Sequence, residues 1–216
     1  MIPDFTRDQL ADLQITASRP LVICDVDEVV VHFTRSFEEY IGKHSLYLDT
    51  SSFALNGNVR KRDSDAALEQ SHIDRLIDDF FIDCTETLPP IDGAVAALHA
   101  LSEQASIVML TNLPHHAREK RINNLRSLGI TFPVVTNSGP KGPAIRHLAT
   151  LTSHPVVFVD DSPSFIASSY AYAPYVHLVH FLQDERFAKH LNPLPYVSLR
   201  TNSWTAAQPH IQKLMG

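Results

Sequence analysis

Short runs of valine, isoleucine and leucine alternate with helix-forming segments along most of this chain, and this alternation constrains the fold more than any other feature. The apolar runs are LVIC at 21–24, SIVML at 106–110, PVVTN at 133–137, PVVFV at 155–159 and YVHLVHF at 175–181. Segments with helical spacing separate the later runs, at 91–105, 114–129, about 143–151 and from about 163. Such alternation is typical of βαβ units with a parallel sheet buried on both faces. We therefore expect an α/β fold with a Rossmann-like parallel sheet core and helices on both faces.

Residues 33–90 interrupt this alternation. Helical patterns cover 32–48 and 66–84, and the basic stretch VRKRD at 59–63 lies between them. A segment of this kind directly after the first strand predicts a small, mainly helical insertion. The sequence thus predicts a core built from residues 1–32 and 91–216, with residues 33–90 inserted into it.

Composition narrows the classes of partner and compartment. The 216 residues carry a net charge of -6, so no overall basic field attracts nucleic acid or an anionic membrane surface. No signal peptide and no membrane span is predicted, and the two cysteines, Cys24 and Cys84, form neither a disulfide framework nor a zinc-binding pattern. We expect a cytoplasmic protein that binds neither nucleic acid nor membrane. The sequence carries no signal for an oligomeric state.

Polar residues follow three of the apolar runs directly. They are Asp25 and Asp27 after the first run, Thr111 and Asn112 after the second, and Asp160 and Asp161 after PVVFV. In an open parallel sheet, ligands bind beyond the carboxyl ends of the strands, so these side chains are expected to converge. The four aspartates would repel one another without a cation, and hard oxygen ligands suit Mg²⁺. The sequence predicts a magnesium site formed by Asp25, Asp27, Asp160 and Asp161.

This set of residues suits phosphoryl transfer. One carboxylate at a strand end can attack phosphorus, and a second one can move protons to and from the leaving oxygen and water. The non-bridging oxygens need donors, for which the Thr111 hydroxyl and a lysine are suitable. Lys141 is the candidate lysine, because it precedes a helix start, where the helix dipole disfavours a cation unless an anion lies beside it.

The same residues resemble the motifs of the haloacid dehalogenase-like (HAD) superfamily, most of whose members are Mg²⁺-dependent phosphatases. The four motifs stand in order as DVDEV at 25–29, LTN at 110–112, Lys141, and VDDSP at 159–163. The resemblance implies that Asp25 is the nucleophile and Asp27 the general acid/base. It further implies that Thr111 and Lys141 hold the phosphate and that Asp160 and Asp161 hold the metal.

The insertion at 33–90 falls where that superfamily places its first type of cap. The resemblance therefore implies a phosphatase that hydrolyses a small phosphate monoester, a phosphorylated metabolite, through an aspartyl-phosphate. The acid/base residue Asp27 argues against dehalogenation, since dehalogenases of the family lack it. Three alternatives stay open: a phosphotransferase or phosphomutase, a protein phosphatase of the RNA polymerase C-terminal-domain type, and a catalytically silent module that binds metal and phosphate.

Several residues have a structural interpretation beside the functional one. Asn112 is both a phosphate-binding candidate and a helix N-cap candidate before Pro114. Glu28 adjoins Asp27 but has no assigned task in this chemistry. Cap residues are expected to select the substrate, and the candidates are Phe33, Arg35, Phe37 and Tyr47.

Overall fold

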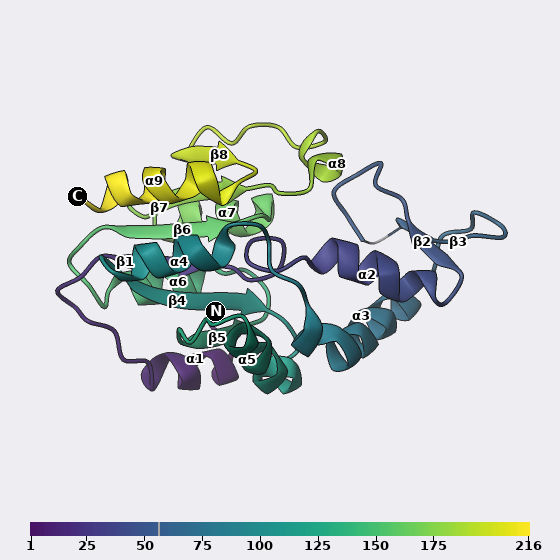
Figure 1. Cartoon of the computed structure of the whole chain (residues 1–216), viewed down its shortest axis with the longest axis horizontal. Helices are drawn as coiled ribbons and strands as arrows, with labels where there is room; N and C mark the ends of the chain where they lie inside the picture. Colours follow the sequence, from purple (N-terminus) through teal and green to yellow (C-terminus); the bar gives the residue numbers. More distant parts are fainter. Residues whose placement is uncertain (56) are drawn as a thin grey trace.

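A computed structural model describes residues 1–55 and 57–216 as an α/β core with a smaller lobe at one end (Figure 1). The core contains a six-stranded sheet in the order β5-β4-β1-β6-β7-β8, and every pair of neighbours in it is parallel. The strands are β1 Leu21–Cys24, β4 Ser106–Asn112, β5 Val134–Asn137, β6 Val156–Asp160, β7 His177–Phe181 and β8 Leu199–Thr201. The predicted Rossmann-like α/β class is confirmed.

Helices cover both faces of the sheet because successive strand residues point to opposite sides. In β1, Leu21 and Ile23 enter one apolar cluster, whereas Val22 and Cys24 enter the other. One face is covered by α1 Asp4–Ala11, α6 Gly142–Ala149 and α7 Pro163–Tyr172, and the other by α4 Ala94–Ser102, α5 Arg118–Ser127 and α9 Trp204–Met215. None of the helices in the described part of the chain has both the length and the hydropathy needed to cross a bilayer.

The segment predicted as a cap forms the smaller lobe (Figure 1). It contains α2 Phe33–Gly42, β2 Leu46–Leu48, β3 Val59–Lys61 and α3 Gln70–Cys84, followed by a short 3-10 helix, Thr85–Thr87. Its two stems are paired, since the His32 amide donates to the Pro89 carbonyl at 2.9 Å and the Ile91 amide donates to the Val30 carbonyl at 2.8 Å. The chain therefore leaves and re-enters the core at one place.

The helical pattern predicted for 32–48 is wrong in its second half. The helix ends at Gly42, Ser45 adopts a positive φ of 58°, and Leu46–Leu48 pairs with Val59–Lys61 as an antiparallel ribbon. Leu46 and Leu48 are buried on either side of the less buried Tyr47, which is the period-two pattern of a strand. Short apolar stretches fit helix and strand equally well until a partner strand is known.

The lobe contacts the core on the side of α8 Glu185–Ala188. Arg186 of α8 binds both carboxylate oxygens of Glu38 on α2, at 2.9 and 2.8 Å. The ring of Phe53 packs edge-on against Phe187, with 5.9 Å between centroids. These contacts join the lobe to the core at a further place, besides the paired stems.

Gly142 allows close packing between α6 and α7. A Cβ atom at this position would lie 2.4 Å from the Ser168 carbonyl oxygen, which belongs to rigid helix backbone. We expect Gly142→Ala to destabilise the fold by about 1–3 kcal/mol through overpacking. Urea unfolding measures this, with Gly42→Ala as the matched control, because a Cβ there meets no atom within 4 Å. Equal unfolding midpoints for the two variants would contradict the packing argument.

Candidate active site

Asp25 lies at the centre of the carboxyl edge of the sheet. Strand β1 is flanked by β4 and β6, with Cys24 in register with Met109 on one side and Val159 on the other. The Asp25 amide donates to the Val159 carbonyl at 2.9 Å, which fixes the backbone beside the end of β6. Carboxylate oxygens of Asp25, Asp160 and Asp161 consequently lie within 4.8 Å of one another.

Lys141 lies under this group of aspartates. Its ammonium is 2.6 Å from Asp25 Oδ1 and 2.7 Å from Asp160 Oδ2, and the side chain is fully buried. Burial opposes a charged lysine, but Asp160 and Asp25 outweigh that effect and raise the pKa of Lys141. The residue occupies the N-cap position of α6, so the anionic partners expected from the sequence are present as two carboxylates.

One ammonium does not neutralise three clustered carboxylates. Burial and the neighbouring Asp25 raise the pKa of Asp160 to about 7, against the lowering effect of Lys141. Burial, together with the charges of Asp160 and Asp25, also raises the pKa of Asp161 well above its ordinary value. The ionised carboxylates of Asp160 and Asp161 therefore lack enough positive charge nearby to stabilise them. Three convergent hard oxygen donors with this deficit fit a divalent cation such as Mg²⁺.

The Asp27 side chain lies outside the group of three. Its Oδ1 accepts a hydrogen bond of 2.5 Å from Nη2 of Arg121 on α5, a guanidinium that is fully buried. Burial raises the pKa of Asp27, whereas the Arg121 charge opposes that rise. The sequence places Asp27 among the metal ligands; in the structure one of its carboxylate oxygens binds Arg121, and the residue lines the site cavity.

Thr111 and Asn112 end strand β4 on the other side of Asp25. The Thr111 hydroxyl is buried and has no hydrogen-bond partner within the described part of the chain, so it has an unused donor. Asn112 does not cap a helix: its amide donates to the Gly139 carbonyl at 2.8 Å and its oxygen accepts from Asn137 at 2.9 Å. Asn112 thus ties together the ends of β4 and β5 and lines the cavity.

The loop that carries Asp27 is tightly folded. The amides of Val30 and Val31 both donate to the Val26 carbonyl, at 2.8 and 3.0 Å. The indole of the buried Trp204 on α9 donates to the Val29 carbonyl at 2.8 Å. Helix α9 therefore supports this loop from the core side.

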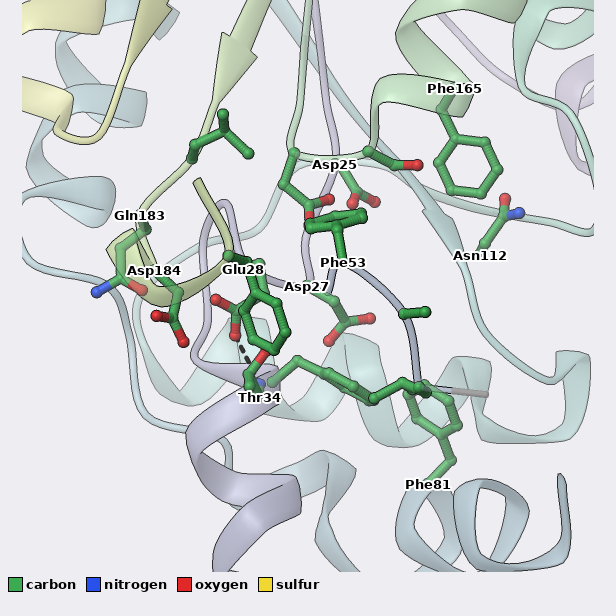
Figure 2. Close-up of a pocket in the computed structure, with 17 residues that line it drawn as sticks. Asp25, Asp27, Glu28, Thr34, Phe53, Phe81, Asn112, Phe165, Gln183 and Asp184 are labelled. Carbon is green, nitrogen blue, oxygen red and sulfur yellow. Dashed lines mark hydrogen bonds between the residues drawn. The ribbon is translucent and has the colours of Figure 1, made fainter. Parts of the chain in front are cut away.

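Glu28 has a structural task that sequence reasoning did not find. It adopts a positive φ of 60°. Its Oε1 accepts a 2.6 Å hydrogen bond from the Thr34 amide in the first turn of α2 (Figure 2). The carboxylate thus accepts a hydrogen bond from one of the backbone amides that lack a partner within the first turn of α2.

A cavity of about 320 Å³ opens beside the aspartates and lies between core and lobe (Figure 2). Phenylalanines from both parts line it, namely Phe33, Phe53, Phe81, Phe165 and Phe187. Of the cap residues expected to contact substrate, only Phe33 lines the cavity. Phe37 is buried behind it, and Arg35 pairs with Glu39.

One further expectation, Tyr47, falls in the ribbon, and one residue of the site, Arg121 on α5, was not expected. Tyr47 hydrogen-bonds Asp65 beside the ribbon and does not line the cavity, because the predicted helix that would have carried it is a strand. Arg121 was missed altogether. It shares a helical face with Ala117 and Leu125, both buried, and a charged residue at that spacing was the available signal for a buried acidic partner.

Comparisons with known proteins find similarity in structure and none in sequence. No protein-family model matches the sequence, and no curated protein matches it. A magnesium-bound HAD-hydrolase of Bacillus subtilis superposes with a TM-score of 0.59 at 14% identity, over 89% of this chain and 97% of that one. A HAD-family hydrolase of Deinococcus radiodurans with bound phosphate and sodium gives 0.60 at 16% identity, over 92% and 97%. An L-2-haloacid dehalogenase gives 0.58 at 12% identity, over 91% and 100%.

The chain therefore has the fold of the haloacid dehalogenase-like hydrolases. The resemblance drawn from its four motifs is confirmed at the level of the fold, and the matches extend over nearly the whole chain, lobe included. Because phosphatases and dehalogenases both occur among proteins of this fold, the reaction has to be argued from the side chains.

Proposed function

We propose that the protein is a HAD-like, Mg²⁺-dependent phosphatase that hydrolyses a small phosphorylated metabolite. The observation that supports this most directly is the convergence of Asp25, Lys141 and the Asp160–Asp161 pair at one sheet edge, with Asp27 beside the adjoining cavity. The cluster of three carboxylates fits Mg²⁺, and Asp25, Asp160 and Asp161 would supply the protein oxygens that bind the ion. Bound there, the ion would neutralise charge on the phosphoryl oxygens.

The residues divide the reaction into two steps. In the first, an Asp25 oxygen attacks phosphorus, the bond between phosphorus and the leaving oxygen breaks, and Asp27 donates a proton to that oxygen. In the second, water attacks phosphorus of the aspartyl-phosphate, Asp27 takes the proton, and Asp25 leaves with inorganic phosphate as product. Lys141 and the Thr111 hydroxyl donate to the non-bridging oxygens.

Asp27 favours phosphate esters over haloacids as substrates. Displacement of a halide needs no proton on the leaving group, whereas an alcohol leaves readily only when it is protonated. Arg121 occupies Oδ1 of Asp27 and leaves the other oxygen available to a leaving group. The small volume of the cavity, about 320 Å³ between core and lobe, favours a small ester over a folded protein substrate.

The proposal predicts release of inorganic phosphate from phenyl phosphate when Mg²⁺ is present. Chelation with EDTA is expected to abolish the release, and excess Mg²⁺ to restore it. Adding glycerol separates hydrolysis from phosphotransfer, because a transferase would form glycerol phosphate in place of inorganic phosphate. Phosphate release that is indifferent to EDTA, or no turnover of any monoester, would refute the proposal.

A further inference from the structure

The cavity beside Asp25 and Asp27 receives the part of the substrate that leaves. Once the phosphoryl group lies among Asp25, Lys141 and Thr111, the leaving group extends past Asp27 into this space, because Lys141 and Thr111 are fully buried while Asp25 and Asp27 line the cavity. Its walls therefore determine which leaving groups bind. This step rests on the proposed function.

Aromatic side chains from both the lobe and the core line the walls of the cavity (Figure 2). Phe33, Phe53 and Phe81 come from the lobe, and Phe165 and Phe187 from the core. Phe33 is held by stacking on Phe37, at 5.6 Å between centroids, and edge-on against Phe80, at 5.2 Å. Rings fixed in this way form a preorganised apolar surface that suits a flat, apolar group.

The walls also lack positive charge. Among the described residues that line the cavity none is Lys, Arg or His, and its carboxylates outside the proposed chemistry are Glu28 and Asp184. The N-terminus of α2 is the place in the wall where an anion would ordinarily bind, but Glu28 already accepts from the Thr34 amide there. The basic residues at 60–62 do not line the cavity, and Arg60 is paired with Asp49 and Asp65.

From these walls we infer that the substrate is a phosphate monoester whose leaving group is a flat, apolar group, of the size of one ring with a modest substituent, without a negative charge. A cavity of ~150 Å³ holds a benzene molecule. The space of about 320 Å³ therefore accommodates a ring with a modest substituent. A carboxylate or second phosphate on the leaving group would be desolvated against phenylalanines with no basic side chain in the described wall to pair with it, since Arg186, beside the wall, is already paired with Asp184 and Glu38.

Binding of non-hydrolysable phosphonates tests this without relying on turnover. The probes are benzylphosphonate, 4-carbamoylbenzylphosphonate and 4-carboxybenzylphosphonate, titrated calorimetrically into the whole protein with Mg²⁺ present. The last two have the same shape and differ by one negative charge. We expect benzylphosphonate and the amide to bind, and the carboxylate to bind at least about tenfold more weakly than the amide. Equal or tighter binding of the carboxylate would overturn the inference.

A charge introduced into the wall provides the second arm. Leu55 lines the cavity from the lobe, so Leu55→Lys places an ammonium there, and Leu55→Met is the uncharged control of similar length. Leu55→Lys is expected to remove the tenfold preference for the amide, whereas Leu55→Met is expected to keep it. If both variants discriminate alike, the wall charge does not set specificity. If the amide binds but phenyl phosphate is not turned over, the proposed phosphatase activity is refuted, and the assignment of the cavity as a binding site for the uncharged group is supported.

Discussion

Asp25→Asn is expected to lower kcat for phenyl phosphate by at least about 10⁴-fold, because the amide cannot form the aspartyl-phosphate. The variant is also expected to fold with an unchanged or raised melting temperature in EDTA. Asn at this position removes one of three mutually repelling carboxylates, and Lys141 keeps its bond to Asp160 at 2.7 Å. Steady-state kinetics and a thermal melt measure the two effects.

Asp8→Asn is the matched control for Asp25→Asn, because Asp8 is exposed on α1, away from the cavity beside Asp25. It is expected to leave kcat and melting temperature unchanged. Quenching wild-type protein during turnover should trap phosphate on Asp25, which mass spectrometry of the peptide detects. Near-normal turnover by Asp25→Asn would exclude Asp25 as the nucleophile, and a partly unfolded variant would be recognised by its melt.

Arg121→Met is expected to destabilise the protein by about 3–5 kcal/mol, because it leaves Asp27 without its buried cationic partner. For a chain of this length the loss corresponds to a fall of roughly 10 °C in melting temperature. Turnover of phenyl phosphate is expected to fall about 10²-fold as well, since Asp27 loses the contact that orients it. Arg126→Met is the control, because Arg126 is exposed on the same helix.

The double variant Asp27→Asn/Arg121→Met isolates the pair. If the ion pair causes the destabilisation, Arg121→Met costs much less in the Asp27→Asn background than in the wild type. Equal costs in both backgrounds would show that Arg121 stabilises α5 by packing alone. A near-normal kcat in Arg121→Met alone would show that Arg121 does not position Asp27 for the reaction.

Much of the site's location follows from local sequence. Asp25, Thr111 and Asp160 each stand at the end of an apolar run, and parallel strands present those ends at one edge of the sheet. The position of Lys141 before a helix start likewise predicted an anionic partner. Local pattern was insufficient in the lobe, where β2 is a strand because it pairs with β3 across residues 49–58.

Contacts between distant segments decided what surrounds the aspartates. Arg121 is one of several basic residues in α5, and only the rotation of that helix against the loop at 25–31 buries it beside Asp27. Phe187 and Asp184 follow β7 with no motif around them, yet they complete the cavity wall on the core side, where Phe187 packs against Phe53 of the lobe.

The sequence by itself determined the α/β class, the edge of the sheet where ligands bind, and the residue types gathered there, because strand period and strand direction are properties of the local chain. The tertiary structure alone decided which carboxylates Lys141 binds, that Asp27 faces Arg121, and that the adjoining cavity is aromatic without positive charge. Those features depend on distances between segments far apart in the chain, which no local pattern encodes.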